Sequence, residues 1–196
     1  MTNPKKLEEF ILRFPLLVVV AKKLNDASID WMIGGSSCLF LLGNERIPGD
    51  VDIFLPDNQH DKADELFSIE SYIHTSKAGP VRNSNPESNH SIQFSSHLEF
   101  NFDKQYKFSV TNIVKQKRIK FEYNGIDFYL LPSEDVLLIK ALLQRGPEEG
   151  KKDIEDIQNF VNIYPIDHNY LNGRIKELNA EERVGGIFNN DKNSYN

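Results

Sequence analysis

The hydrophobic and polar positions of this chain follow two periods, one typical of helices and one typical of strands. Apolar residues at helical spacing predict an amphipathic helix over about residues 5–25, bent near Pro15, and a short helix over residues 36–42. Apolar runs bounded by turn residues predict strands at 31–33 and 50–55. The first part of the chain therefore reads as helix, strand, helix and strand.

The middle of the chain is dominated by predicted strands. A short helix is expected at about residues 61–67, and the Gly-, Pro-, Ser- and Asn-rich stretch 77–89 predicts a mobile loop. Residues 91–94 and 98–102 predict two strands or one bent hairpin. A further hairpin is expected over residues 119–130, because Asn124-Gly125 is a strong two-residue turn signal.

The last third of the chain is predicted to be helical. Helices are expected over residues 133–144, 151–162 and 168–178, and the first of them begins with a Ser cap and acidic residues. The pattern predicts three units: a core with an N-terminal helix (1–131), a helical segment packed on that core (132–180) and a flexible tail (181–196).

The net charge and the cysteine content argue against some classes of protein and cellular location. The 196 residues carry a net charge of −6, which argues against a general nucleic-acid coat. The single cysteine, Cys38, allows no intrachain disulfide and indicates a reducing, cytoplasmic location. The apolar run at residues 10–21 is too short and too interrupted by charge to span a bilayer.

The most informative feature is the order of a Gly-Gly-Ser turn and two aspartates. Gly34, Gly35 and Ser36 join a strand to a helix, and such a turn lets backbone N–H groups approach phosphate oxygens. Asp50 and Asp52 lie two residues apart on the next strand, so their side chains share one face. Two carboxylates on one face suit Mg²⁺, although an isolated strand of this pattern is more often a solvated polar face.

Three further positions complete the candidate site. Glu99 is the preferred third acid, with Asp103 in reserve, and a solvated strand face is the alternative for Glu99. Arg46 precedes the acidic strand and either contacts a phosphate or is solvated. Lys140 lies beside an apolar helical stripe and either extends to water or reaches the nucleotide site.

A small group of basic residues raises the question of RNA binding. Its members are Lys115, Lys117, Arg118 and Lys120. A solvated strand and loop is the simpler interpretation, and a local RNA contact is the alternative.

Three stretches together resemble a known superfamily. They are 33–54, which holds the Gly-Gly-Ser turn and the aspartate pair, 131–140 and 152–157. In these the chain is similar to polymerase-beta-type nucleotidyltransferases, most of all to small stand-alone prokaryotic members of the antibiotic-modifying and toxin types. The similarity extends unevenly over roughly residues 28–160, and the first stretch is the most specific.

The resemblance implies an α/β (α+β) fold, with a mixed sheet flanked by helices and followed by a helical segment. It implies a Mg²⁺-dependent enzyme that transfers a nucleoside monophosphate from an NTP to a hydroxyl acceptor and releases pyrophosphate. Matched to the motifs, Gly35 and Ser36 would bind the triphosphate, Asp50 and Asp52 the magnesium ions, and Glu99 would be the third acid, where the family more often has Asp.

Two alternatives share this fold. One is a catalytically inactive nucleotide- or partner-binding module, and the other is a toxin-type enzyme that acts on tRNA. The expected partners are an NTP and an unidentified hydroxyl acceptor, either a small molecule or RNA, with no membrane and with a homodimer left open.

Overall fold

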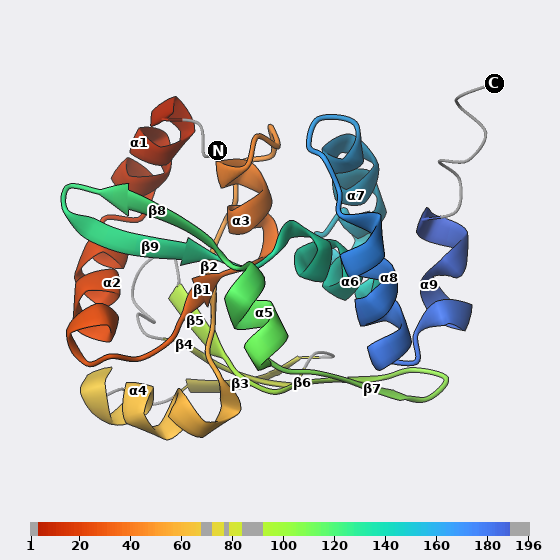
Figure 1. The fold of residues 1–196 in the computed structure, drawn as a ribbon, viewed down its shortest axis with the longest axis horizontal. Helices are drawn as coiled ribbons and strands as arrows, with labels where there is room; N and C mark the ends of the chain where they lie inside the picture. The colour runs from red at the N-terminus through yellow and green to blue at the C-terminus, as the bar shows by residue number, and fades with distance from the viewer. Residues whose placement is uncertain (1–3, 68–71, 77–78, 84–91, 189–196) are drawn as a thin grey trace.

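A mixed β-sheet forms the centre of the molecule (Figure 1). The computed structural model describes residues 4–67, 72–76, 79–83 and 92–188 and, within 72–83, the backbone alone. In these residues the sheet has seven strands, in the order β3 (Tyr72–Ser76), β4 (Gly79–Asn83), β5 (Ile92–Ser95), β2 (Val51–Phe54), β1 (Met32–Ile33), β9 (Ile126–Leu130) and β8 (Ile119–Tyr123).

The pairing around the centre of the sheet combines both strand directions. The two-residue strand β1 runs antiparallel to β2 and parallel to β9, with Ile33 opposite Ile53 on one side and Leu130 on the other. Strand β2 in turn runs parallel to β5. The expected mixed sheet is confirmed, and its short central strand ends where the Gly-Gly turn begins.

A second, two-stranded sheet lies apart from the first. Strand β6 (Leu98–Asn101) pairs with β7 (Gln105–Phe108), so β5 and β6 belong to different sheets although only a short turn separates them. Strand β7 was not expected. Its alternation of exposed Gln105 and Lys107 with buried Tyr106 and Phe108 is too short to be distinguished from a loop by periodicity.

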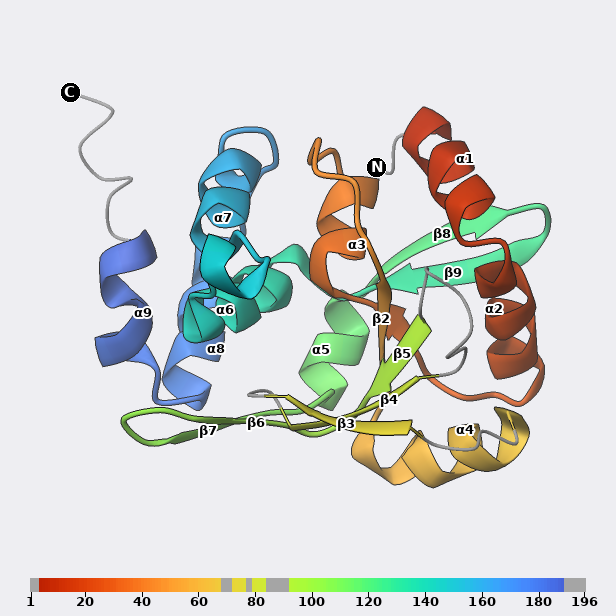
Figure 2. The same ribbon diagram turned by 180° about the vertical axis from the view of Figure 1, so that it is seen from behind.

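The N-terminal helical region is divided at Pro15. Helix α1 (Pro4–Arg13) ends before this proline and α2 (Leu16–Asp26) begins after it, because proline has no N–H to donate to the preceding turn. Both helices lie on the side of the sheet that carries β8 and β9 (Figures 1 and 2). The other short helices of the first two thirds are α3 (Gly35–Leu41), the 3₁₀ turn η1 (Asp57–Gln59), α4 (His60–Phe67) and α5 (Asn112–Lys117).

The C-terminal helices form a bundle around α6. Every residue of α6 (Ser133–Leu143) is buried, and the helix contacts α3, α7 (Asp153–Val161), α8 (His168–Glu177) and α9 (Glu181–Phe188). A 3₁₀ turn, η2 (Pro147–Glu149), connects α6 to α7. Figure 2 shows this bundle at the end of the molecule opposite α1 and α2. The boundary placed between residues 131 and 132 stays a prediction.

Two segments that were expected to lack secondary structure contain it. Residues 181–188, assigned to the flexible tail, form helix α9, because Val184 is buried and Arg183 Nε donates to the Leu142 carbonyl over 2.7 Å. Residues 79–83 of the expected loop form β4, which pairs with β3 and β5. The rest of that loop and residues 189–196 lie outside the described residues.

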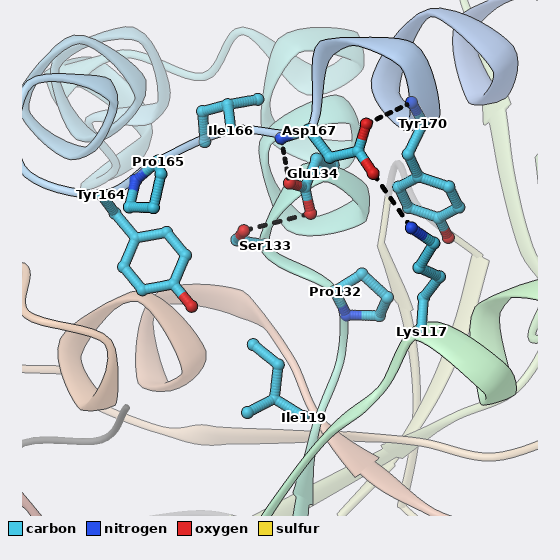
Figure 3. Close-up of a pocket in the computed structure, with 10 residues that line it drawn as sticks. All are labelled: Lys117, Ile119, Pro132, Ser133, Glu134, Tyr164, Pro165, Ile166, Asp167 and Tyr170. Atoms are coloured by element: carbon cyan, nitrogen blue, oxygen red, sulfur yellow. Dashed lines mark hydrogen bonds and ion pairs between the residues drawn. The ribbon is translucent and has the colours of Figure 1, made fainter.

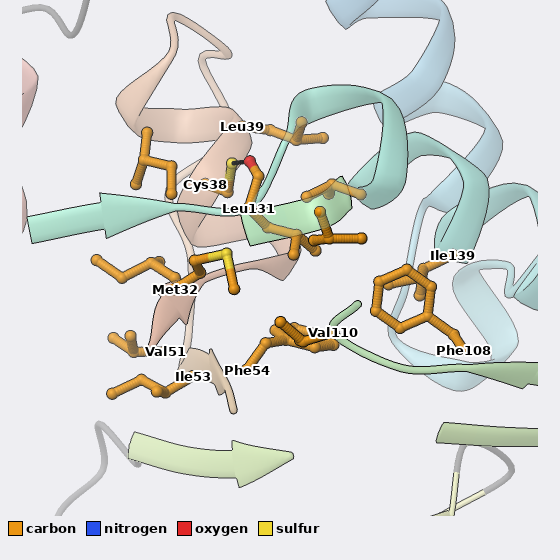
Figure 4. Close-up of a cluster of buried hydrophobic side chains, with 14 of the residues drawn as sticks. Met32, Cys38, Leu39, Val51, Ile53, Phe54, Phe108, Val110, Leu131 and Ile139 are labelled. Atoms are coloured by element: carbon orange, nitrogen blue, oxygen red, sulfur yellow. Dashed lines mark hydrogen bonds between the residues drawn. The ribbon is translucent and has the colours of Figure 1, made fainter. Parts of the chain in front are cut away.

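A continuous apolar core joins the sheet to the helices. Figure 4 shows Met32 and Ile53 from the sheet in one cluster with Leu39 of α3 and with Ile139 of α6, which lies beside Phe108. Cys38 lies in the same cluster with its Sγ 3.4 Å from the Leu131 carbonyl, and burial raises the pKa of its thiol. None of the helices in the described part of the chain is long and apolar enough to cross a membrane.

A buried ion pair fixes α8 against α6. Arg174 Nε donates to Asp135 Oδ1 over 2.7 Å, and the side chains are 2% and 0% exposed. The Tyr170 hydroxyl donates to the second oxygen of Asp135, and Arg174 also pairs with Glu177. Because a buried charge that loses its partner is costly, this pair ties the bundle together.

We expect the substitution Arg174→Met to lower the free energy of unfolding by about 3 kcal/mol, because it leaves the Asp135 carboxylate buried without its cation. Urea denaturation followed by circular dichroism would measure this change. The exposed i,i+4 pair of Lys22 and Asp26, at 2.6 Å, offers a control, and Lys22→Met should have a much smaller effect. Equal effects of the two substitutions would contradict a structural role for the buried pair.

Candidate functional site

The Gly-Gly turn after β1 packs directly on alternate side chains of β2. The Gly34 N–H donates to the Asp52 carbonyl over 2.8 Å, which extends the β1–β2 ladder by one residue. A β-carbon on Gly34 would lie 2.3 Å from the Phe54 ring, and one on Gly35 would lie 2.1 Å from Asp52 Oδ2. Neither distance is compatible with a side chain, so the sequence needs glycine at both positions.

Gly35 has a second reason to be glycine. Its φ angle is +56°, in the left-handed region that residues with a β-carbon rarely adopt. The turn bends the chain from β1 into α3 and places the backbone of Gly35 against the Asp52 carboxylate. The turn and the carboxylate therefore lie on the same side of the sheet, as the sequence-based hypothesis requires.

The negative charges of Asp50 and Asp52 repel each other. Partial burial, and then the charge of Asp50, raise the pKa of Asp52 to about 6, and the cations Lys151, Arg145 and Lys140 oppose this rise. Lys151 Nζ lies 3.9 Å from Asp50 Oδ2. Such a pair gains from a further cation placed between its oxygens.

Lys140 connects α6 to the Gly-Gly-Ser turn. Its ammonium group lies 3.4 Å from Ser36 Oγ, 3.1 Å from Asp153 Oδ1 and 2.8 Å from Asp156 Oδ2. Its side chain is only 5% exposed, so the ammonium group is buried in this network and does not extend to water. Extension of Lys140 to water does not fit this burial, and its role at a nucleotide site stays a prediction.

Two arginines extend this charged network. Arg46 Nη1 lies 2.6 Å from Asp156 Oδ2, and Arg145 Nε lies 2.9 Å from Asp153 Oδ2. Arg145 and Lys151 were not among the residues expected at the site. No spacing in the sequence signals them, because they come from the connection between α6 and α7 that folds back toward β2.

The structure places Glu99 outside the main sheet. It lies on β6, where its carboxylate contacts His97 Nε2 at 3.0 Å and Lys107 Nζ at 3.2 Å. The hydrogen bond from His97, and then that from Lys107, lower the pKa of Glu99. In the parallel pairing of β2 with β5, the residue in register with Asp52 is Gln93. Glu99 as the third acid stays a prediction.

The structure also shows the partners of Asp103, the reserve candidate for the third acid, and a separate acidic cluster on α4. Asp103 accepts hydrogen bonds from the Tyr106 hydroxyl at 3.0 and 3.1 Å. Within the described residues, the side chains of His60, Asp61 and Asp64 at the start of α4 form one cluster that could hold a metal ion. Their ligand atoms all lie within 4.8 Å of one another. Asp50, Asp52 and Glu99 do not form such a cluster within the described residues.

Solved nucleotidyltransferases share this fold at low sequence identity. A putative nucleotidyltransferase from Thermotoga maritima has a TM-score of 0.55 and 15% identity over 83% of this chain and 96% of its own. The solution structure of the antibiotic-resistance factor ANT(2'')-Ia has a TM-score of 0.56 and 11% sequence identity, over 88% of this chain and 95% of its own. The complex of ANT(2'')-Ia with adenylyl-2''-tobramycin has a TM-score of 0.52 and 11% sequence identity, over 83% of this chain and 96% of its own. A search of curated proteins found no similar sequence.

The family comparison covers most of the chain. Residues 13–185 match the model of a family described as nucleotidyl transferase of unknown function (DUF2204). This match includes the Gly-Gly-Ser turn, the aspartate pair, Lys140 and the charged start of α7. It confirms the resemblance seen in the sequence, and the chain therefore belongs to this family of nucleotidyltransferase enzymes.

Proposed function

We propose that this nucleotidyltransferase uses Mg²⁺ to transfer a nucleoside monophosphate from an NTP to a hydroxyl group of an acceptor, with release of pyrophosphate. The observation that carries the proposal is the contact of the Asp52 carboxylate with Gly35, beside Asp50 and the buried Lys140. It joins a phosphate-accessible turn, a pair of acids and fixed positive charge in one place.

The acidic pair has the chemistry of a magnesium site. Asp52 on β2 and Asp50, directly before that strand, offer hard oxygen ligands, and their mutual repulsion is relieved when a divalent cation is shared. Bound there, Mg²⁺ would neutralise charge that develops on the attacking and leaving oxygens. Glu99 is proposed as the third acid, with Asp103 as its alternative.

The turn and its cations have the chemistry of a triphosphate site. Gly35 and Ser36 are partly exposed, so a phosphate oxygen can approach their backbone, whereas Gly34 is buried and its N–H already donates to the Asp52 carbonyl. Because Lys140 donates to Ser36 Oγ, the hydroxyl proton of Ser36 can be directed at a ligand oxygen. Arg46, whose side chain is 29% exposed, adds positive charge at the open edge of the network.

A small-molecule acceptor is favoured over tRNA. Each member of the basic group at residues 115–120 pairs with an acid: Lys115 and Arg118 with Asp30, Lys117 with Asp167, and Lys120 with Asp127. Because these charges are already neutralised, they offer little attraction for a nucleic-acid backbone. The cytoplasmic location and the homodimer stay predictions from the sequence.

We expect Asp50→Asn and Asp52→Asn each to lower the rate of pyrophosphate release by at least about 100-fold, because each removes a charged metal ligand worth several kcal/mol in the transition state. The assay would use labelled NTPs, Mg²⁺ and a pool of hydroxylated metabolites, with circular dichroism to check the fold. Asp61→Asn, in the separate acidic group on α4, is the matched control and should keep full activity. An unchanged rate in both site variants would overturn the assignment of the two acids, and the absence of pyrophosphate release by the wild-type protein would support the inactive binding module instead.

We expect Gly35→Ala to reduce NTP binding by at least about tenfold, because the new methyl group displaces the Asp52 carboxylate and blocks the turn. Gly125→Ala is a close control. Gly125 also has a positive φ, +76°, but a β-carbon there would meet nothing within 4 Å. Both substitutions carry a backbone cost of roughly 1–2 kcal/mol, so only a loss specific to Gly35 reports on the site. Calorimetric titration with ATP and Mg²⁺ would measure it.

The raised pKa of Asp52 predicts a pH-dependent stability in the absence of metal. The folded protein holds this proton up to about pH 6, whereas the unfolded chain releases it near the ordinary value of 3.8. The Asp52 carboxyl therefore costs stability as the pH rises from about 4 to 6. In EDTA we expect Asp52→Asn to be more stable than wild type above pH 6 and equal to it below pH 4, as measured by urea denaturation. A difference that does not change with pH would contradict the assignment.

A further inference from the structure

A pocket of about 360 Å³ lies at the N-terminal end of α6, away from the glycine turn (Figure 3). Its lining includes Pro132 and Glu134 at the start of α6, Tyr164 from the connection between α7 and α8, and Tyr170 from α8. Lys140, which reaches the turn, comes about two helical turns later on α6, or roughly 10 Å along its axis. The pocket is thus a separate place from the proposed triphosphate site, and its volume suits one small molecule.

The walls of this pocket combine apolar and aromatic side chains with a few charged ones. Tyr164 lies on one side and Tyr170 on the other, with Ile119 below them in Figure 3. Tyr164 is held by stacking on Phe160, with ring centroids 5.1 Å apart. Aromatic faces combined with apolar side chains accept a hydrophobic group and also attract cations.

The charge in the pocket is unbalanced. Lys117 Nζ is paired with Asp167 Oδ2 at 2.9 Å, so these two charges neutralise each other. Glu134 accepts hydrogen bonds from the Asp167 backbone N–H at 2.8 Å and from Ser133 Oγ at 3.1 Å. Both donors are neutral, and in the part of the chain that the structure describes no lysine, arginine or histidine forms an ion pair with Glu134.

Glu134 also keeps the capacity to bind a ligand. It is only 8% exposed, yet an ionised carboxylate has about four acceptor positions, of which these two hydrogen bonds use half. Its neighbour Asp135 has its own cation, Arg174, whereas Glu134 faces only these neutral donors and the N-terminus of α6. The pKa of Tyr164 is raised, first by burial and then by the charges of Cys38 and Glu134.

We propose that this pocket binds a small organic cation, an ammonium group attached to a compact apolar or aromatic body. The ammonium group pairs with Glu134, and the body lies against Tyr164, because the Tyr170 ring already carries Lys117 Nζ, 5.4 Å from its centroid. This site is separate from nucleotide binding and holds whether or not the Mg²⁺-dependent reaction proposed above is confirmed. A free phosphate on Lys117 is the competing occupant, and the charge balance disfavours it.

Binding of 2-phenylethylammonium at pH 7 tests the proposal, with the uncharged 2-phenylethanol as its matched analogue. We expect the amine to bind wild-type protein at least about tenfold more tightly than the alcohol, because only the amine makes a charged hydrogen bond to Glu134. Calorimetry gives the affinities, and ¹H–¹⁵N NMR shifts should locate the amine at Tyr164, Asp167 and Tyr170. Shifts confined to Gly35 and Ser36, or equal affinity for the two probes, would overturn the proposal.

Two variants separate the contributions of charge and ring. Glu134→Gln should remove the preference for the amine over the alcohol, whereas Glu122→Gln on exposed β8 removes the same charge elsewhere and should change nothing. If Glu134→Gln does not fold, Tyr164→Leu gives an independent test, because loss of the ring should weaken amine binding by roughly threefold. Binding of inorganic phosphate that depends on Lys117, without binding of the amine, would assign the pocket to an anion instead.

Discussion

The contact between the bare backbone of Gly35 and the carboxylate of Asp52 is the constraint on which the rest of the site depends. A side chain at Gly35 would occupy the position of Asp52 Oδ2, and one at Gly34 would occupy that of the Phe54 ring. Because these glycines follow β1 and the two side chains come from β2, the antiparallel pairing of two short strands fixes their contact. The β1–β2 ladder thus sets the position of Asp52 relative to the glycine turn.

Helix α6 is the second organising element, because it brings charge into the interior at both ends. Its eleven residues are all buried, yet they include Glu134, Asp135 and Lys140. Asp135 is neutralised by Arg174, and Lys140 by Asp153 and Asp156. These pairs join α6 to α8 and α7, so the same interactions that hold the bundle together also orient the cation next to Ser36.

Much of this arrangement could be read from the sequence. The Gly-Gly-Ser turn and the aspartate pair were identifiable because glycine and alternating acids act through local geometry, and the structure brings the turn against Asp52. Arg145 and Lys151 could not be identified, because they approach Asp52 only through the fold of the α6–α7 connection. The position of Glu99 depended on which strand pairs with β2, and a strand's periodicity does not reveal its partner.

The placement of the charges along the chain has a consequence for biosynthesis. The acids and the glycine turn belong to the first 54 residues, whereas Lys140, Arg145 and Lys151 come from the last third of the sequence. A nascent chain that has emerged only as far as β5 carries the acidic pair without these counter-cations, and β1 still lacks its parallel neighbour β9. The counter-cations therefore reach the acidic pair late on the ribosome, when the C-terminal helices dock.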